Sequence, residues 1–64
     1  MIIKLKNAVK EHEGKIFLLN ADTIISVYEA KDEDGTDCVF VFGGVDRTWK
    51  VQDTVEEIYA QITQ

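Results

Sequence analysis

Short runs rich in isoleucine, valine and phenylalanine recur along the chain, and each is followed by a polar or glycine-containing stretch. Runs of this length and composition predict β-strands separated by turns. Asn20 can cap a single helical turn. The pairs Asp34-Gly35 and Gly43-Gly44 favour tight turns later in the chain, because these residues tolerate positive φ. We therefore expect five strands, at about residues 2–6, 15–19, 24–30, 37–42 and 47–52.

The hydrophobic period changes after residue 53. Apolar side chains then recur at the i, i+3, i+4 and i+7 spacing of one helix face, at Val55, Ile58, Tyr59 and Ile62. Asp53, with Glu56 three residues later, is similar to a capping box, so we expect a helix over about 54–63. A helix this short needs packing to be stable. The fold class is therefore expected to be α+β: an antiparallel meander sheet of about five strands, flat or curled, with one C-terminal amphipathic helix packed on one face.

The strand at 37–42 is apolar on both faces, since every residue from Cys38 to Phe42 is hydrophobic. If the flanking loops contain two or four residues, Phe40 lies opposite Glu29 on one side and Trp49 on the other. The expected core face, which the helix should cover, then carries Ile25, Val27, Cys38, Phe40, Phe42, Trp49 and Val51. The expected outer face carries Ile24, Ser26, Tyr28, Val39, Val41, Thr48 and Lys50.

One helix cannot cover both faces of a sheet, and this outer face is half apolar. Such a face is closed by a second copy of the chain or by the sheet curling on itself. We expect a homo-oligomer, a dimer or larger. Its assembly surface is predicted around Ile24, Tyr28, Val39 and Val41.

Composition narrows the function classes. The 64 residues carry twelve acidic and seven basic side chains and a net charge of −5. Nucleic-acid binding normally needs a stripe of basic side chains, so we do not expect nucleic acid as a partner. No apolar run is long enough for a membrane span, and the start of the chain is too short and too charged for a signal peptide, so we expect a cytoplasmic protein. Cys38 is the only cysteine, which excludes an intrachain disulfide.

No catalytic or metal-binding set is evident. His12 lies in a polar loop, the only serine is Ser26 in mid-strand, and Cys38 belongs to an apolar run typical of a buried thiol. The stretch 32–37 has the carboxylates of a calcium loop, but Val41 occupies the position of the required glutamate. We therefore expect a protein that is not an enzyme and has no cofactor.

The alternative to a protein that acts only through protein contacts is a protein that binds a small ligand. Arg47 and Trp49 lie beside Gly43-Gly44, and a guanidinium next to an aromatic plane can stack on a base and hold a phosphate. Strand alternation separates Lys50 from both, so these groups, with Tyr28, would converge only at a seam between subunits. This interpretation predicts binding or sequestration of a small ligand such as a nucleotide signal by a bacterial or phage protein.

Two stretches, "LLNADTIISV" (Leu18–Val27) and "WKVQDTVEEIYAQI" (Trp49–Ile62), resemble the small flagellar FlbD/SwrD-like family in order and spacing. The resemblance implies a noncatalytic protein that acts through protein contacts, linked in that family to flagellar motor function. The turns "KDEDGTD" and "GGVDRT" depart from the family pattern. Taken with the composition, the sequence predicts a small interaction module that self-associates and binds another macromolecule.

Overall fold

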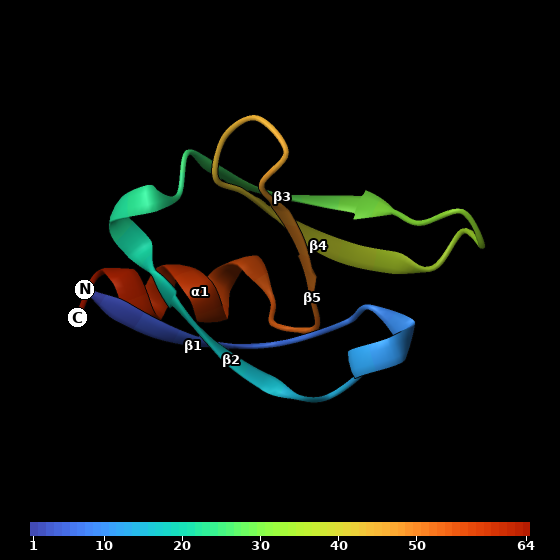
Figure 1. Cartoon of the computed structure of the whole chain (residues 1–64), viewed down its shortest axis with the longest axis horizontal. Helices are drawn as coiled ribbons and strands as arrows, with labels where there is room; N and C mark the ends of the chain where they lie inside the picture. The colour runs from blue at the N-terminus through green and yellow to red at the C-terminus, as the bar shows by residue number, and fades with distance from the viewer.

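The computed structural model describes all residues, 1–64, as five strands, one α-helix and two 3-10 turns (Figure 1). The strands are β1 (Ile2–Lys6), β2 (Ile16–Asn20), β3 (Ser26–Lys31), β4 (Asp37–Phe42) and β5 (Thr48–Val51). The 3-10 turns are η1 (Lys10–His12) and η2 (Ala21–Thr23), and the helix is α1 (Val55–Ile62).

The strands form two antiparallel sheets, so the expected single meander is wrong. One sheet is the β1–β2 hairpin and the other has the order β3-β4-β5. As expected, Asn20 caps a helical turn: its Oδ1 accepts a hydrogen bond from the Asp22 N–H at 3.0 Å. This turn, η2, carries the chain from one sheet to the other, so β2 and β3 do not pair (Figure 1).

The two sheets are joined at one corner. Asn7 bridges Val51, and the Gln52 N–H donates to the Lys6 carbonyl at 2.9 Å. Helix α1 lies between the sheets and contacts β1 and β3 (Figure 1). The two sheets and the helix therefore enclose a single core.

The loop between β3 and β4 overturns the expected register. Asp32 N–H donates to the Thr36 carbonyl, and Gly35 N–H donates back to the Asp32 carbonyl. This leaves three residues in the loop, with Gly35 at φ 78°, as in a type I turn followed by a bulge. An odd loop shifts the pairing by one residue, so Tyr28 lies opposite Phe40.

The loop between β4 and β5 also contains three residues, but its turn begins one residue later, at Gly44. Gly43 N–H donates to the Arg47 carbonyl, and Arg47 N–H donates to the Gly44 carbonyl. Asp46 takes the left-handed conformation, with φ 63°. Val41 consequently faces Trp49, and Phe40 faces Lys50 instead of Trp49.

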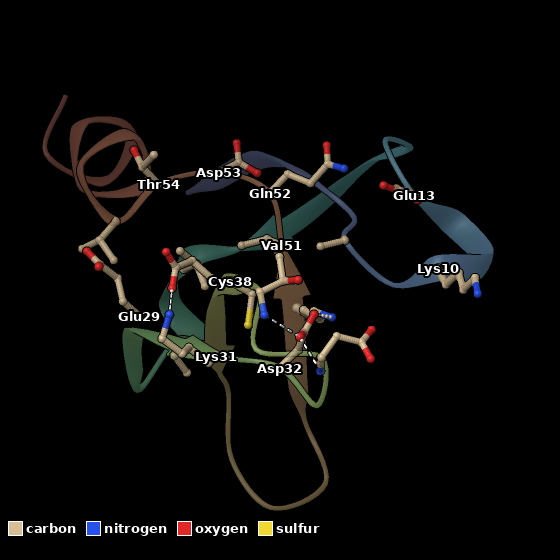
Figure 2. A pocket seen from close by; sticks show the side chains of 18 of the residues that line it. Lys10, Glu13, Glu29, Lys31, Asp32, Cys38, Val51, Gln52, Asp53 and Thr54 are labelled. Atoms are coloured by element: carbon tan, nitrogen blue, oxygen red, sulfur yellow. Dashed lines mark hydrogen bonds and ion pairs between the residues drawn. The ribbon is translucent and has the colours of Figure 1, made fainter.

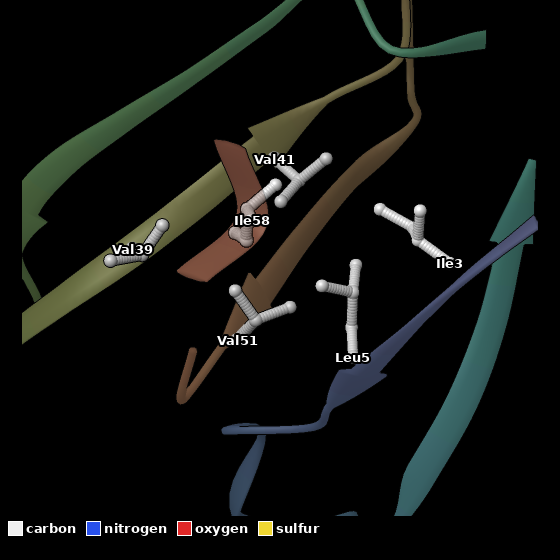
Figure 3. Packing of buried hydrophobic residues seen from close by; sticks show 6 residues of the cluster. All are labelled: Ile3, Leu5, Val39, Val41, Val51 and Ile58. Atoms are coloured by element: carbon white, nitrogen blue, oxygen red, sulfur yellow. The ribbon is translucent and has the colours of Figure 1, made fainter. Parts of the chain in front are cut away.

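Because a one-residue shift moves every side chain to the other face, the expected faces of β4 are exchanged. Val41 is completely buried and Val39 is 8% exposed, whereas Cys38, Phe40 and Phe42 are only partly buried on the other face. The core lies between the two sheets and the helix (Figure 3). Its six buried members are Ile3, Leu5, Val39, Val41, Val51 and Ile58.

The predicted helix is present, but it begins at Val55 and its cap is displaced by one residue. Thr54 and Glu57 form the capping box, with both reciprocal hydrogen bonds at 3.0 Å. Asp53 is unavailable as a cap because its Oδ1 accepts the Lys6 N–H at 2.7 Å. Tyr59, expected in the packed stripe, is 67% exposed.

Candidate functional site

The four residues of the predicted ligand cluster do not converge in one chain. Trp49 lies on the core face of β5 and Lys50 on the opposite face. Arg47 is exposed in the β4–β5 loop. Lys50 shares its face with Tyr28 and Phe40, but its ammonium is held by the Asp32 carboxylate at 3.1 Å. The structure therefore pairs Tyr28 with Phe40, at 5.8 Å between ring centroids, and not with the indole.

The four residues of the predicted assembly surface also do not lie together on one exposed surface. Val39 and Val41 belong to the core, so an assembly surface centred on them is wrong; the register shift described above is the cause. Ile24 is partly buried against that core. Of the four residues, Tyr28 alone is exposed.

A broad open groove of about 910 Å³ runs between the β3–β4 hairpin, the end of β5 and the start of α1 (Figure 2). It is lined by more acidic than basic side chains. The carboxylates are Glu13, Glu29, Asp32, Asp34, Asp37, Asp53 and Glu56, and the lysines are Lys10, Lys31 and Lys50.

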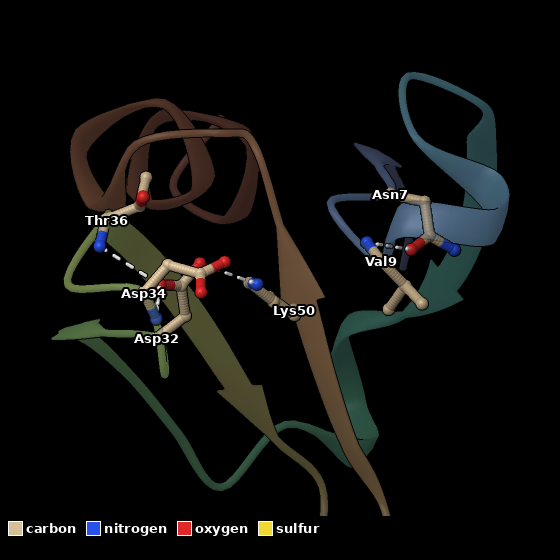
Figure 4. A network of polar contacts seen from close by, with 6 residues as sticks. All are labelled: Asn7, Val9, Asp32, Asp34, Thr36 and Lys50. Carbon is tan, nitrogen blue, oxygen red and sulfur yellow. Dashed lines mark hydrogen bonds and ion pairs between the residues drawn. The ribbon is translucent and has the colours of Figure 1, made fainter.

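Three hydrogen bonds in the groove converge on the Asp32 carboxylate (Figure 4). Its Oδ1 accepts the N–H groups of Asp34 and Thr36, at 2.9 and 3.0 Å, and its Oδ2 accepts from Lys50 Nζ. The hydrogen bond from Lys50, followed by that from Thr36, lowers the pKa of Asp32, and the same carboxylate raises the pKa of Lys50. Asp32 therefore fixes the loop and stays ionised.

A second ion pair in the groove joins Lys31 of β3 to Asp37 of β4. Lys31 Nζ donates to Asp37 Oδ1 at 2.7 Å, and this hydrogen bond raises the pKa of Lys31. These lysines are thus charged partners of carboxylates and not proton-transfer groups at neutral pH. No three His, Cys, Asp or Glu side chains are gathered so that they could hold a metal ion.

The outer face of the β1–β2 hairpin has a different character. Alternation places Ile2, Lys4, Lys6, Ile16, Leu18 and Asn20 on it, and we call these six residues the hairpin face. Ile16 and Leu18 are each 63% exposed, and Ile2 is 62% exposed. The hairpin face carries no acidic side chain, although the chain as a whole has a net charge of −5.

One edge of this hairpin is closed by the rest of the molecule. Gln61 of α1 pairs with the β1 backbone like a neighbouring strand: its Oε1 accepts the Lys4 N–H at 3.0 Å, and its Nε2 donates to the Lys4 carbonyl at 2.7 Å. Asp53 accepts the Lys6 N–H, and Gln52 donates to the Lys6 carbonyl. The outward backbone groups of Lys4 and Lys6 are therefore all bonded.

The other edge of the hairpin is open. Antiparallel pairing uses the backbone groups of alternate residues, and on β1 and β2 the bonded ones are odd-numbered, as in Asn7 N–H to the Lys15 carbonyl. The groups of Ile16, Leu18 and Asn20 therefore point away from β1. No further strand follows β2 in its sheet.

The free edge of β3 differs because it is charged. By the same alternation, Glu29 and Lys31 lie along it, and charged residues are a common protection of edge strands. Strand β2, "IFLLN", has no charge at all. The sequence does carry this signal, since "IFLL" is uncharged, but only the tertiary structure identifies it as an edge.

Comparison with known proteins gave no match, either to a protein-family model, to a curated protein or to a solved structure. The resemblance to the FlbD/SwrD-like family stays a prediction. The helices are also too short and too polar for any of them to cross a lipid bilayer.

Proposed function

We propose that this chain is a noncatalytic, cytoplasmic interaction module that self-associates and binds another macromolecule through the hairpin face and the open edge of β2. The observation that carries the proposal is an uncharged edge strand whose outward side chains, Ile16 and Leu18, are about two-thirds exposed. Exposed edges of this kind pair with further strands from other chains.

Self-association is tested by measuring molar mass against concentration by light scattering, over roughly 10–500 µM, because a contact built on one short strand lies at the small end of interface sizes. We expect the mass of the wild-type protein to rise with concentration. Leu18→Lys should abolish the rise, since it removes an apolar contact and places a charge at the edge. Val45→Lys, in the β4–β5 loop, is the matched control because Val45 is also exposed. A wild-type protein that stays monomeric throughout would overturn the proposal.

The small-ligand alternative is separated by a thermal-shift experiment with nucleotides. A ligand that binds only the native state raises the melting temperature by mass action. The interaction module should show no shift with any nucleotide. A shift that Arg47→Ala abolishes would favour a nucleotide-binding protein instead.

A further inference from the structure

The structure points to a specific partner for the open edge, an inference that rests on the proposed function: we propose that β2 pairs antiparallel with β2 of a second copy, about a twofold axis at Leu18. Two β1–β2 hairpins then form one continuous four-stranded sheet. The contact is isologous, so it closes as a dimer.

The alternation of backbone hydrogen bonds along β2 permits this arrangement. Outward N–H and C=O groups belong to Ile16, Leu18 and Asn20, as the bonding pattern of the hairpin shows. A twofold axis at Leu18 places Leu18 opposite Leu18 of the second copy, and Ile16 opposite Asn20 of the second copy. All of these are hydrogen-bonding positions of an antiparallel ladder, so the outward groups of Ile16 and Leu18 and the Asn20 N–H meet complementary groups. The Asn20 carbonyl already accepts the Thr23 hydroxyl at 2.7 Å, so the pairing would give this carbonyl a second hydrogen bond.

Charge also favours a second copy. Strand β2 has no charged residue, so the twofold axis brings no like charges into contact. The nearest charged residues, Lys15 and Asp22, lie outside β2, and the Asp22 carboxylate is 3.7 Å from the N-terminal ammonium of its own chain.

Side chains on the hairpin face add to the pairing. Leu18 of the two copies become direct cross-strand neighbours, flanked by Ile16 of each copy. Cross-strand contacts between large apolar side chains stabilise antiparallel sheets. Lys4 and Lys6 lie one strand further out, so they do not face their own copies across the axis.

Disulfide trapping tests the register directly, in a Cys38→Ala background that removes the only native thiol. Opposed residues of a bonded pair have Cα atoms about 5.5 Å apart, which a disulfide can span. Leu18→Cys should therefore cross-link to itself under mild oxidation. Ile16→Cys is the matched control, because its own copies are offset by four residues, about 13 Å along the strand. Leu18→Cys should give about tenfold more covalent dimer than Ile16→Cys in the same time.

A mixture separates the possible registers. Ile16→Cys mixed with Asn20→Cys should form the heterodimer. Preferential cross-linking of Ile16→Cys with Leu18→Cys would place the axis elsewhere and overturn the inference.

The outcomes distinguish this inference from the proposed function. If Leu18→Lys dissolves a wild-type oligomer but Leu18→Cys does not cross-link, self-association through the hairpin face stands and the twofold pairing is wrong. A wild-type protein that is monomeric at all concentrations overturns both.

Discussion

The clamp that Gln61 forms on the β1 backbone gives the sharpest stability prediction. Gln61→Ala removes both hydrogen bonds to Lys4, at 3.0 and 2.7 Å. A typical intramolecular hydrogen bond contributes about 0.5–1.5 kcal/mol, so the pair contributes about 1–3 kcal/mol. Alanine has a higher helix propensity than glutamine by a few tenths of a kcal/mol, which acts in the opposite direction. We therefore expect the free energy of unfolding to fall by about 1–2 kcal/mol.

The assay is urea denaturation, followed by the fluorescence of Trp49, together with hydrogen exchange at the Lys4 amide. The denaturation midpoint should fall with an unchanged slope, because the surface exposed on unfolding is almost the same. The Lys4 amide should lose its protection in the variant. Gln61→Glu keeps an acceptor for this amide but loses the donor to the Lys4 carbonyl. Its urea midpoint should therefore lie between those of the wild-type protein and Gln61→Ala. Gln64→Ala, at the exposed end of the chain, is the control.

An unchanged midpoint in Gln61→Ala, with the Lys4 amide still protected, would show that β1 does not depend on the helix to satisfy its edge. Loss of the two hydrogen bonds also exposes a second open edge on the hairpin. The tendency of the variant to associate should then exceed that of the wild-type protein at equal concentration.

Three further predictions concern the core, a close contact and pH. Val41→Ala should destabilise the protein by about 2–3 kcal/mol in urea, because Val41 is completely buried; a loss below about 0.5 kcal/mol would contradict the observed register. Gly43→Ala should cost about 1–3 kcal/mol, because a Cβ at Gly43 would lie 2.7 Å from the Trp49 ring; an unchanged urea midpoint would show that the ring moves aside freely. Asp32 has a lowered pKa in the folded state, so its contribution is present above the unfolded pKa of about 4 and is lost as the pH falls through the folded value. The urea midpoint of the wild-type protein should therefore fall as the pH is lowered below about 4, and Asp32→Asn should show a smaller fall than the wild type.

Local patterns in the sequence are sufficient to predict the secondary-structure elements and their order. The change from short β-type runs to a helical period predicts five strands and a C-terminal helix, and both are present. The sequence predicts the Asn20 cap because its side chain needs only the N–H two residues later. Such interactions are local, so sequence alone can predict them.

The register was decided by loop length, which the sequence left open. Asp34-Gly35 fits a two-residue type I′ turn and equally a three-residue loop with a bulge at the glycine. The second loop places Asp46, a non-glycine residue, in the left-handed region, where sequence gives little warning. One residue in each loop decided whether Val39 and Val41 lie outside or in the core.

The tertiary structure alone decided which edges are closed. Asp53 looks like a helix cap in the sequence, but it bonds Lys6, 47 residues away, and Gln61 reaches Lys4 across 57 residues. Side chains at such separations meet only after the sheets and the helix have packed together. The same packing leaves the outer edge of β2 unpaired, because no other strand lies beside that edge.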